Sequence, residues 1–486
     1  MHLTAELWPF ARTGGLGEAV AGLAVAQAAA GLSTTLVMPL YRGVRETTAS
    51  LECVGGPIAV TVGGRVERVS LYRAPDAGAG PRTFFIEHPG LFDRPGIYGS
   101  NGSDYPDNAL RFAVFCAAAV AVLPEIAPAA DVLHAHDWHT ALAPAYLRTK
   151  FAESAFHSRL ATVLSVHNAG FQGHFAPAIM AELGLPDHLY NPEAFEWYGR
   201  LNLLKGGLAF SDIAVTVSPN HARELLTAEG GFGLQGTFAA RGDRLVGILN
   251  GIDTELWNPT TDPDIAARYS IQDLSGKAQC KAALQQAYRL PQRDDLPLFG
   301  MSARLVSQKG LDLILDTDLP AMPDAQYIFL GAGERRYEAA LTELAAAAPD
   351  RIAVELAFTD RLEHRLLAGA DLLLMPSLYE PCGLTQMRAQ RYGAIPLARR
   401  VGGLSDSIEH GETGFLFDDY APASLTRGMR EALDRYHDRA AWGTMVRHAM
   451  SQPVGWETSA RRYLDLYACA RAARQAPCVA PSVGWS

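Results

Sequence analysis

The stretch Pro376-Ser377-Leu378-Tyr379-Glu380-Pro381-Cys382-Gly383-Leu384-Thr385-Gln386 decides the fold that we expect. An apolar run at 370–375 precedes it and is typical of a buried parallel strand. Residues 387–392 follow it and are typical of a helix. Glu380 therefore lies in a turn at the carboxyl end of a strand, which is where open α/β sheets bind their ligands.

The turn itself combines one carboxylate with the start of a helix. Gly383 and Thr385 are small, so the backbone N–H groups of the first helical turn are free to meet an anion. A ligand with hydroxyls at one end and phosphates at the other, such as a nucleotide sugar, matches this pattern. A surface turn whose glutamate is solvated matches the turn equally well when it is taken alone.

Length and composition limit the class of protein. A chain of 486 residues exceeds one hydrophobic core, so we expect two domains of about 200 to 250 residues. The composition, 48% hydrophobic and 19% charged, is that of a globular protein. A net charge of −10 without a long basic run argues against nucleic acid or an anionic membrane as the main partner.

The cysteines and the apolar segments predict a cytoplasmic protein. The cysteines are scattered without a CxxC pair, which is typical of reduced thiols and not of a disulfide framework or zinc site; they are Cys53, Cys116, Cys280, Cys382, Cys469 and Cys478. Residues 19–32 follow a glycine-rich turn and precede a strand, so they belong to a βαβ unit and not to an export signal. The longest apolar run, 112–123, is too short to span a bilayer and predicts a core helix.

The first forty residues predict a strand, a glycine-rich turn, a helix and a second strand. In the turn, Arg12 has the geometry to fork onto a phosphate, and Gly14 and Gly15 let a ligand approach the backbone. Helix entry alone explains such a turn equally well. It also lacks the GxGxxG spacing of a dinucleotide fold.

Polar residues close two later apolar strands, at 131–136 and 161–166. Asp137 follows the first and is a candidate for hydroxyl binding or charge stabilisation. His167 follows the second, where a site residue competes with the commoner case of a core histidine. The histidines His134, His136 and His139 argue only weakly for a metal, because the first two share a strand face and the third lies beyond the turn.

A second strand–turn–helix series begins at 298–305, after a linker that we place near 251–260. Arg304 and Lys309 lie in the turn after its first strand, where two cations beside a helix start predict a diphosphate clamp without a metal. Each of them alone is equally compatible with a solvated surface cation. Gly331 belongs to a second glycine turn suited to close approach of a ligand. Phe358 follows a short strand and is a candidate for stacking on a base, although a core phenylalanine fits its position equally well.

Taken together and in order, these motifs resemble those of bacterial glycogen synthase, the relative of plant starch synthases. The stretches that carry the resemblance are Thr13-Gly14-Gly15-Leu16, His134-Ala135-His136-Asp137-Trp138-His139, Val166-His167-Asn168, Leu249-Asn250-Gly251, Ser307-Gln308-Lys309-Gly310-Leu311, Glu380-Pro381-Cys382-Gly383-Leu384-Thr385 and Gly402-Gly403-Leu404. They extend over nearly the whole chain. Each stretch is short, but in this order they are highly specific.

The resemblance implies a retaining glycosyltransferase of the α/β GT-B fold, with two Rossmann-like doubly wound domains facing each other across a deep cleft. It places an acceptor-side domain at 1–250, completed by a C-terminal helix at about 456–475, and a nucleotide-sugar-binding domain at 258–455. It implies that glucose is transferred from ADP-glucose to an α-1,4-glucan such as glycogen or a maltooligosaccharide, with release of ADP and without a cofactor or metal.

The resemblance also implies roles for single residues. Its catalytic candidates are Asp137, His167, Arg304, Lys309 and Glu380. Its donor-binding candidates are Arg12, Gly14, Gly15, Asn250, Gly331, Phe358, Cys382, Gly383, Leu384 and Thr385. Its acceptor-side candidates are Glu6, Asn168 and Gln172, the last in a loop that follows the His167 strand. Attack on the same face as the departing diphosphate is the expected route to retention, and a covalent glycosyl-enzyme is the alternative.

Three departures from the family pattern bear on the substrate. The family usually has Lys where this chain has Arg12, often has Tyr where it has Phe358, and commonly has Asp where it has Glu18. These departures leave UDP-glucose open as an alternative donor. A non-catalytic glucan-binding protein is a second alternative, and the complete set of polar strand ends argues against it. A dinucleotide-dependent oxidoreductase is a third, which the missing GxGxxG disfavours.

Overall fold

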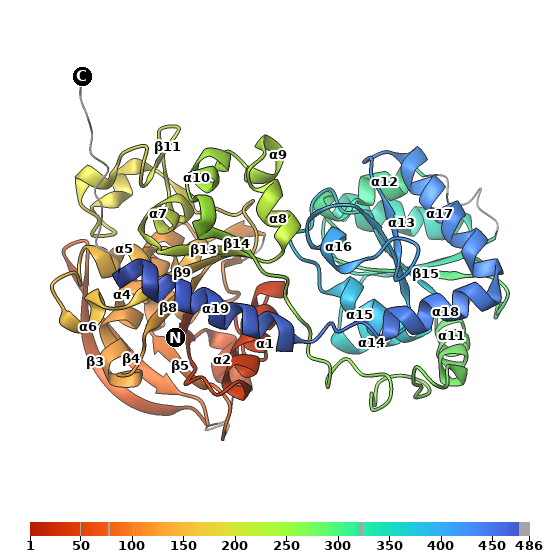
Figure 1. The fold of residues 1–486 in the computed structure, drawn as a ribbon, viewed down its shortest axis with the longest axis horizontal. Coiled ribbons are helices and arrows are strands. Elements are labelled where there is room, and N and C mark those ends of the chain that lie inside the picture. Colours follow the sequence, from red (N-terminus) through yellow and green to blue (C-terminus); the bar gives the residue numbers. More distant parts are fainter. Residues whose placement is uncertain (49, 76–77, 101, 318, 320–323, 476–486) are drawn as a thin grey trace. The chain divides into compact units, whose positions relative to one another are not determined.

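The structure is a computed structural model that describes residues 1–486 except 49, 76–77, 101, 318, 320–323 and 476–486. The chain forms two compact units (Figure 1). Unit 1 comprises 1–217, 222–248 and the C-terminal segment from 456, and unit 2 comprises 218–221 and 249–455. Residues 249–257, which we expected at the end of the first domain and in the linker, therefore belong to unit 2. Cys478 lies outside the described residues.

Unit 1 is built on a nine-stranded sheet in the order β14-β13-β9-β8-β1-β2-β5-β4-β3. The strands, in that order, are Leu245–Gly247, Ile213–Thr216, Ala161–Val166, Val132–His136, His2–Leu3, Thr35–Pro39, Arg82–Glu87, Arg65–Arg73 and Glu52–Val62. All pairs from β14 to β5 are parallel, and β3 and β4 extend the sheet antiparallel. The predicted antiparallel excursion at 51–90 is therefore right for β3 and β4, whereas β5 also pairs parallel with β2.

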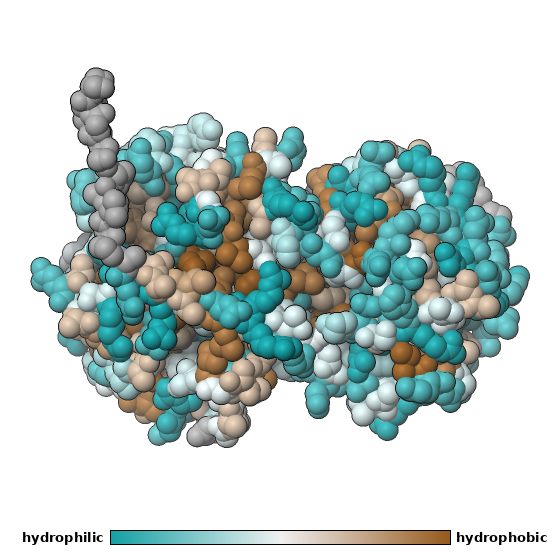
Figure 2. Space-filling model, viewed as in Figure 1, coloured by the Kyte–Doolittle hydropathy of each residue, from teal (hydrophilic) through white to brown (hydrophobic). Residues whose placement is uncertain are grey.

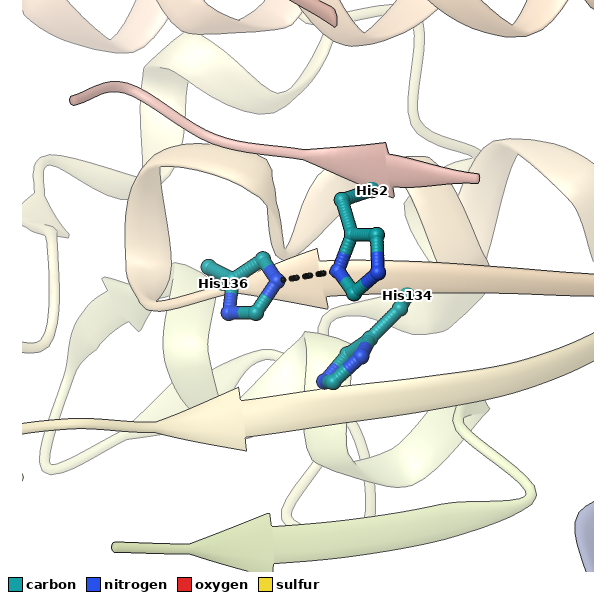
Figure 3. Close-up of side chains that lie close together, drawn as sticks. All are labelled: His2, His134 and His136. Atoms are coloured by element: carbon teal, nitrogen blue, oxygen red, sulfur yellow. Dashed lines mark hydrogen bonds between the residues drawn. The ribbon is translucent and has the colours of Figure 1, made fainter. Parts of the chain in front are cut away.

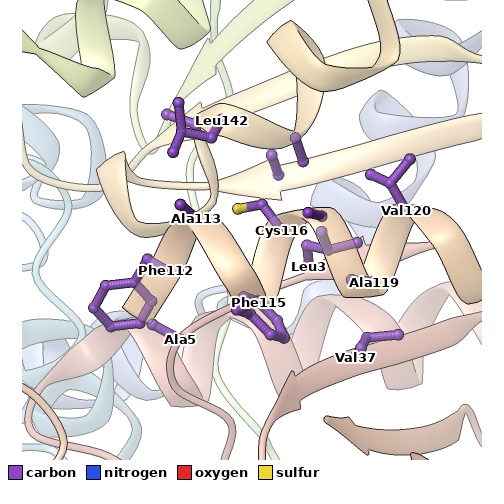
Figure 4. Packing of buried hydrophobic residues seen from close by; sticks show 14 of the residues in the cluster. Leu3, Ala5, Val37, Phe112, Ala113, Phe115, Cys116, Ala119, Val120 and Leu142 are labelled. Carbon is purple, nitrogen blue, oxygen red and sulfur yellow. The ribbon is translucent and has the colours of Figure 1, made fainter. Parts of the chain in front are cut away.

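The long apolar helix α4 (Asn108–Ile126) forms the centre of the unit 1 core (Figure 4). Its side chains Phe112 and Cys116 are fully buried together with Leu3 of the first strand. With 19 residues the helix is long and apolar enough to cross a membrane, so our expectation that no segment reaches that length was wrong. Its most apolar 18-residue window is 78% buried inside the protein, in agreement with the predicted core helix.

Two further long helices of unit 1 pack against each other. Helix α1 (Gly15–Ala29) follows β1, and α19 (Trp456–Gln475) packs against α1 and β9. The contact is close, because a Cβ added at Gly22 would lie 2.1 Å from the indole nitrogen of Trp456. The C-terminal helix thus returns to the unit that contains the N-terminus, as the resemblance implied.

Unit 2 contains a parallel six-stranded sheet in the order β17-β16-β15-β18-β19-β20. The strands are Ile352–Glu355, Gln326–Leu330, Leu298–Ser302, Leu372–Met375, Ile395–Arg399 and Phe415–Phe417. Its helices are α11 (Ser275–Ala287), α12 (Leu311–Leu315), α13 (Arg335–Ala347), α14 (Asp360–Gly369), α15 (Thr385–Arg391), α16 (Gly402–Ser407), α17 (Pro422–His437) and α18 (Arg439–Met450). The apolar run at 370–375 is the central strand β18, as predicted.

The remaining elements are short. They are α2 (Arg42–Thr47), α3 (Pro89–Phe92), β6 (Gly99–Ser100), β7 (Ser103–Asp104), α5 (Leu142–Arg148), α6 (Ala155–Ser158), β10 (His174–Phe175), β11 (Glu196–Trp197), β12 (Arg200–Asn202), α7 (Leu203–Phe210), α8 (Pro219–Glu224), α9 (Ala228–Gly231), α10 (Gln235–Ala239), and 3-10 turns at 138–140, 177–180, 187–189, 242–244 and 307–309. On the face shown in Figure 2, hydrophilic residues predominate and hydrophobic ones form separate patches.

Candidate active site

Each sheet has a topological switch point, where successive crossovers turn to opposite sides. In unit 2 this point lies between β15 and β18, because the chain proceeds from β15 outward to β17 and then returns to place β18 on the other side of β15. Loops that leave the carboxyl ends of two such strands diverge and create a crevice for ligands. The loop after β15 contains Arg304 and Lys309, and the loop after β18 contains Glu380.

Lys309 and Glu380 meet at this switch point. The Lys309 ammonium lies 2.5 Å from Oε2 of Glu380, and the Ser377 hydroxyl donates to the same oxygen over 3.1 Å. The side chains of Lys309 and Glu380 are only 22% and 8% exposed. A partly exposed ammonium with one fixed carboxylate partner is a preorganised cation, and it keeps donors free for an anionic ligand.

Glycines allow the loops around Glu380 to pack this closely. Gly310 has φ +76°, and an added Cβ would lie 2.0 Å from the carbonyl oxygen of Pro376. Gly402 has φ +42°, and its Cβ would lie 1.8 Å from the carbonyl oxygen of Glu380. Side chains at either position would force the Glu380 loop apart, which explains the glycines in both motifs.

The other predicted donor-binding residues of unit 2 differ in their exposure to solvent. Arg304 is exposed on the loop after β15, and Phe358 is 47% exposed, so Phe358 is not a core residue. Gly331 has φ +149°, and an added Cβ would lie 1.9 Å from the carbonyl oxygen of Ala303. The packing of two loops accounts for Gly331, and the close approach of a ligand to it stays a prediction.

The loop from Cys382 to Thr385 leads directly into α15. Leu384 is the N-cap residue, and Thr385 is the first residue of the helix. Cys382 is buried beside the backbone N–H of Asn250, and burial raises the pKa of its thiol to about 12. The thiol therefore stays protonated at neutral pH and is a poor nucleophile.

In unit 1 the switch point lies between β1 and β8, and Glu6 follows β1 there. Its carboxylate accepts hydrogen bonds from the backbone N–H groups of Thr13 and Gly14 (2.7 and 3.2 Å), from the Thr13 hydroxyl (2.8 Å) and from the Tyr98 hydroxyl (2.7 Å). Glu6 is 4% exposed. It therefore holds the glycine turn in place, and its expected place on the acceptor side stays a prediction.

The glycine turn itself is already supplied with negative charge. The Glu6 carboxylate meets the free N–H groups before α1, and Arg12 forms an ion pair with Glu18 in the first turn of that helix. Both contacts place negative charge near the N-terminus of the helix, where the helix dipole favours it. The expected contact of Arg12 with a phosphate stays a prediction. An added Cβ at Gly14 would meet no atom within 4 Å, so this glycine leaves open space in the turn. Gly15, the first residue of α1, is exposed.

Asp137 lies at the end of β8 in a strained conformation, with φ +57° for a residue that has a Cβ. Its Oδ1 accepts a hydrogen bond of 2.7 Å from the backbone N–H of His167, which joins the two predicted strand ends. Burial raises the pKa of Asp137 from its ordinary 3.8 to about 7, although the backbone N–H groups of His167 and Asn168 favour the charged form. Asp137 therefore changes charge near neutral pH.

This titration predicts a pH effect that Asp137→Asn removes. We expect kcat of the wild type to rise with pH through about 7 as the carboxylate forms. We expect a lower kcat without this limb in the variant. Because the folded state binds the proton more tightly than the unfolded state, the stability contributed by this protonation is present at low pH and is lost as pH rises through about 7.

Pairs of melting curves at about pH 5 and about pH 8 measure the same group without substrate. We expect the melting temperature of Asp137→Asn, relative to the wild type, to be higher at the upper pH. The exposed Asp187→Asn in the same unit is the control and keeps the wild-type slope. Equal slopes for Asp137→Asn and the wild type contradict the assignment.

His167, Asn168 and Gln172 lie after β9, but their side chains differ in availability. His167 is half-buried, and its Nε2 lies 3.0 Å from Nδ1 of His136. Asn168 accepts a hydrogen bond from the backbone N–H of Gly170 over 2.9 Å. Gln172 is 3% exposed and bonds protein groups at both ends of its amide, so it holds this loop. Its expected place on the acceptor side stays a prediction.

The histidine-rich stretch divides into two groups. His134 and His136 share one face of β8, as predicted, and their rings stack with centroids 4.2 Å apart. His139 lies elsewhere and stacks on Tyr98. The residue that joins the first two is His2, which the sequence analysis did not single out. The three could hold a metal by distance, since one ligand atom of each lies within 4.8 Å of the others.

Sequence reasoning also missed Ser377 and Tyr98. Ser377 precedes Glu380 by three residues, and this spacing within a loop was a usable signal for a side-chain contact. Tyr98 reaches Glu6 from 92 residues away, and no local pattern announces such a contact.

Family models match both units. Residues 1–240 match the model described as starch synthase catalytic domain, and residues 285–448 match the model described as glycosyl transferases group 1. The chain is 42% identical to a glycogen synthase of Anaeromyxobacter dehalogenans strain 2CP-C, with 96% of this chain and 98% of that protein covered. It is 39% identical to glycogen synthase 2 of Geobacter sulfurreducens, with 98% and 99% covered.

Solved structures agree with these relatives. The catalytic domain of starch synthase IV from Arabidopsis thaliana, bound to ADP and acarbose, matches with a TM-score of 0.89 and 31% identity over 97% of this chain and 99% of that one. A sucrose-phosphate synthase from Thermosynechococcus elongatus matches with a TM-score of 0.62 and 16% identity over 97% and 98%, which shows the fold alone. The two largely parallel sheets and these neighbours define the GT-B fold that we predicted. The family models and the glycogen synthase relatives argue against the dinucleotide-dependent oxidoreductase. The chain belongs to the family of bacterial glycogen synthases and plant starch synthases and is a glycosyltransferase.

Proposed function

We propose that this enzyme transfers glucose from ADP-glucose to the non-reducing end of an α-1,4-glucan, with retention at the anomeric carbon and release of ADP. The observation that carries the proposal is the pair of Lys309 and Glu380 at the switch point of unit 2, a fixed cation where an α/β sheet receives a nucleotide. The starch synthase IV relative, which is bound to ADP and acarbose, supports a nucleotide and a glucan as ligands.

Departure of the diphosphate is the step that these residues assist. The leaving group gains negative charge in the transition state, and Lys309 and Arg304 stabilise that charge from the loop after β15. Arg304 is exposed and long enough to adapt to the diphosphate, whereas Lys309 is held by Glu380. Two cations supply the charge that a divalent metal supplies in other transferases, so we propose a reaction without a metal.

Asp137 and His167 act in this proposal on the sugar side of the reaction. The Asp137 carboxylate stabilises positive charge that develops at the anomeric carbon, and His167 positions the sugar through a ring nitrogen. Asn168 and the exposed Phe358 are the remaining contacts that the proposal retains, to the acceptor and to the donor base respectively.

Same-face attack is the route to retention that we favour. A double displacement needs a free carboxylate nucleophile beneath the anomeric carbon. Oε2 of Glu380 already accepts from Lys309 and Ser377, and the Cys382 thiol stays protonated. Both facts lower the nucleophilicity of Glu380 and Cys382, which supports direct transfer of glucose from the diphosphate to the acceptor hydroxyl.

Nucleotide release tests the proposal and its nearest alternative together. The purified chain is given ADP-glucose or UDP-glucose, each with and without glycogen, and the released nucleotide is measured. We expect glycogen-dependent release of ADP that exceeds release of UDP. Faster release of UDP overturns the donor assignment and directs attention to Arg12 and Phe358. Absence of release from both donors, in a sample that melts cooperatively, favours a non-catalytic glucan-binding protein.

A further inference from the structure

A cluster of buried histidines lies beneath the sugar-side residues of unit 1 (Figure 3). His2 projects from β1, and His134 and His136 project from the neighbouring strand β8. All three side chains are at most 2% exposed. The mechanism proposed above uses none of them, although His136 directly contacts His167.

The cluster belongs to a continuous chain of hydrogen bonds that begins at His167. Nε2 of His167 lies 3.0 Å from Nδ1 of His136, and Nε2 of His136 lies 3.0 Å from Nδ1 of His2. Nε2 of His2 then lies 2.8 Å from Oε1 of Gln27 on α1. The Gln27 amide nitrogen donates to the Tyr467 hydroxyl of α19 over 2.9 Å.

A metal ion does not fit this cluster as it stands. Every ring nitrogen of His2, His134 and His136 already lies within hydrogen-bond distance of a protein atom, since His134 contacts the Tyr467 and Ser165 hydroxyls at 2.8 and 2.7 Å. Binding of a metal would break at least three of these contacts in a fully buried place. The hydrogen-bonded chain is therefore the better explanation of the geometry.

The chain has a direction, because each ring is neutral and has one proton to donate. Burial lowers the pKa of His2, His136 and His167, so these rings stay uncharged at neutral pH. A neutral imidazole donates from one nitrogen and accepts at the other. The Gln27 oxygen can only accept, so His2 donates from Nε2 and accepts at Nδ1. His136 must then donate from Nε2 and accept at Nδ1, and His167 must donate from Nε2.

We propose that Gln27 sets the tautomer of His167 through His2 and His136, and that His167 thereby presents an unprotonated Nδ1 to the substrate. Among the described residues no protein group bonds this nitrogen, and it is not one of the buried unpaired polar atoms. An unprotonated Nδ1 accepts a hydrogen bond from a sugar hydroxyl, whereas the other tautomer donates one. Gln27 is thus a positioning residue, and the inference about catalysis rests on the proposed role of His167.

Nuclear magnetic resonance of the full chain with 15N-labelled histidine measures the tautomer without any substrate. Long-range correlations between ring protons and nitrogens distinguish a protonated from an unprotonated nitrogen. The His167→Gln variant identifies the His167 signals by their loss. In the wild type we expect His167 protonated at Nε2 and not at Nδ1. Protonation at Nδ1, or a stoichiometric metal ion in the purified protein, overturns the proposal.

Substitution of Gln27 tests whether that residue sets the tautomer. In Gln27→Met the acceptor for His2 is lost, so we expect a shift of His167 toward the Nδ1-protonated form. Tyr467→Phe is the milder second variant. It removes the partner that orients the Gln27 amide, and we expect a partial shift in the same direction. An unchanged His167 tautomer in a folded sample of either variant contradicts the relay.

Gln285→Met in unit 2 is the matched control. Gln285 is 2% exposed and bonds the Arg293 carbonyl and the Gln326 side chain, so the same substitution removes an equally buried amide. We expect a similar loss of melting temperature but the wild-type tautomer. A shift of His167 toward the Nδ1-protonated form in this control shows that general destabilisation, and not the relay, changes the tautomer.

Kinetics separate the relay from the proposed reaction. With ADP-glucose and glycogen, we expect Gln27→Met to lower kcat by about twofold to tenfold, as the competent tautomer falls to half of the population or below. KM for glycogen should stay unchanged, because no acceptor contact is altered. A Gln27-dependent tautomer without transferase activity in the wild type would retain the relay and reject the proposed function. Transferase activity together with a His167 tautomer that does not depend on Gln27 would retain the proposed function and reject the relay.

Discussion

Replacing Lys309 by Met is expected to lower kcat with ADP-glucose by about 10²- to 10³-fold, the loss measured when one preorganised donor to a developing anion is removed. The reason is geometric, since Glu380 holds the ammonium at 2.5 Å before any ligand arrives. The variant also leaves a carboxylate of 8% exposure without its ion pair, so we expect a lower melting temperature. Steady-state kinetics below the new melting temperature measure the catalytic part.

A double variant separates catalysis from stability. In Lys309→Met with Glu380→Gln the unpaired buried charge is gone, so we expect most of the lost stability to return while kcat remains low. Lys281→Met is the matched control, because Lys281 forms a 2.7 Å pair with Asp371 and both side chains are 13% exposed or less. Asp371 precedes β18 and so lies at the amino-terminal end of this strand, whereas Glu380 follows its carboxyl end. We therefore expect this control to lose stability and to keep kcat.

Two results would contradict the role of Lys309 in stabilising the leaving group. Recovery of kcat in the double variant shows that Lys309 serves the fold and not the diphosphate. A fall of kcat in Lys281→Met that matches the fall in Lys309→Met shows that any broken ion pair in unit 2 has this effect. Either result contradicts the assignment of Lys309 to the leaving group.

Arg304→Ala is expected to cut kcat by about a hundredfold or more and to leave the melting temperature unchanged. Arg304 is exposed on the loop after β15, so its removal leaves no buried partner unsatisfied. Lys at this position keeps the charge but loses the two-pronged geometry of a guanidinium, and we expect partial activity for Arg304→Lys. Turnover of ADP-glucose and a melting curve for each variant measure both effects.

The control for Arg304 is an exposed arginine of the same unit. Arg427 on α17 has a side chain that is 67% exposed and lies beside the edge strand β20. We expect Arg427→Ala to keep the wild-type kcat. Near-normal turnover in Arg304→Ala excludes Arg304 from the diphosphate clamp and leaves Lys309 as its cation.

Much of the candidate site was predictable because parallel sheets impose a simple rule. Side chains at the carboxyl ends of neighbouring parallel strands lie at the same end of the sheet, so the positions of Lys309 and Glu380 after two strands are compatible with the contact that the structure shows. The same rule applies to Asp137 and His167, which follow neighbouring strands, and the structure joins them by a hydrogen bond of 2.7 Å.

Other parts of the site depended on contacts that no local pattern contains. The glycine turn indicated an anion, but the anion that the structure places there is Glu6 of the protein itself. Arg12 likewise meets Glu18. A sequence pattern shows that a backbone turn favours negative charge, whereas only the packed chain decides which carboxylate supplies it.

The sequence by itself determined the fold, the two-part organisation and the family. The signals were apolar strands followed by polar residues, glycine turns between strands and helices, and motifs whose order is specific to the family. These are local signals, because the period of a strand and the start of a helix depend on neighbouring residues.

Only the tertiary structure decided how the polar groups pair. Gln27 and Tyr467 are 440 residues apart, and His2 reaches His136 over 134 residues. Such contacts depend on the register of β1 against β8 and on the return of α19 to the first helix. The tautomer of His167 is therefore a property of the packed unit, because the nitrogen that donates in each ring depends on a partner that is distant in sequence.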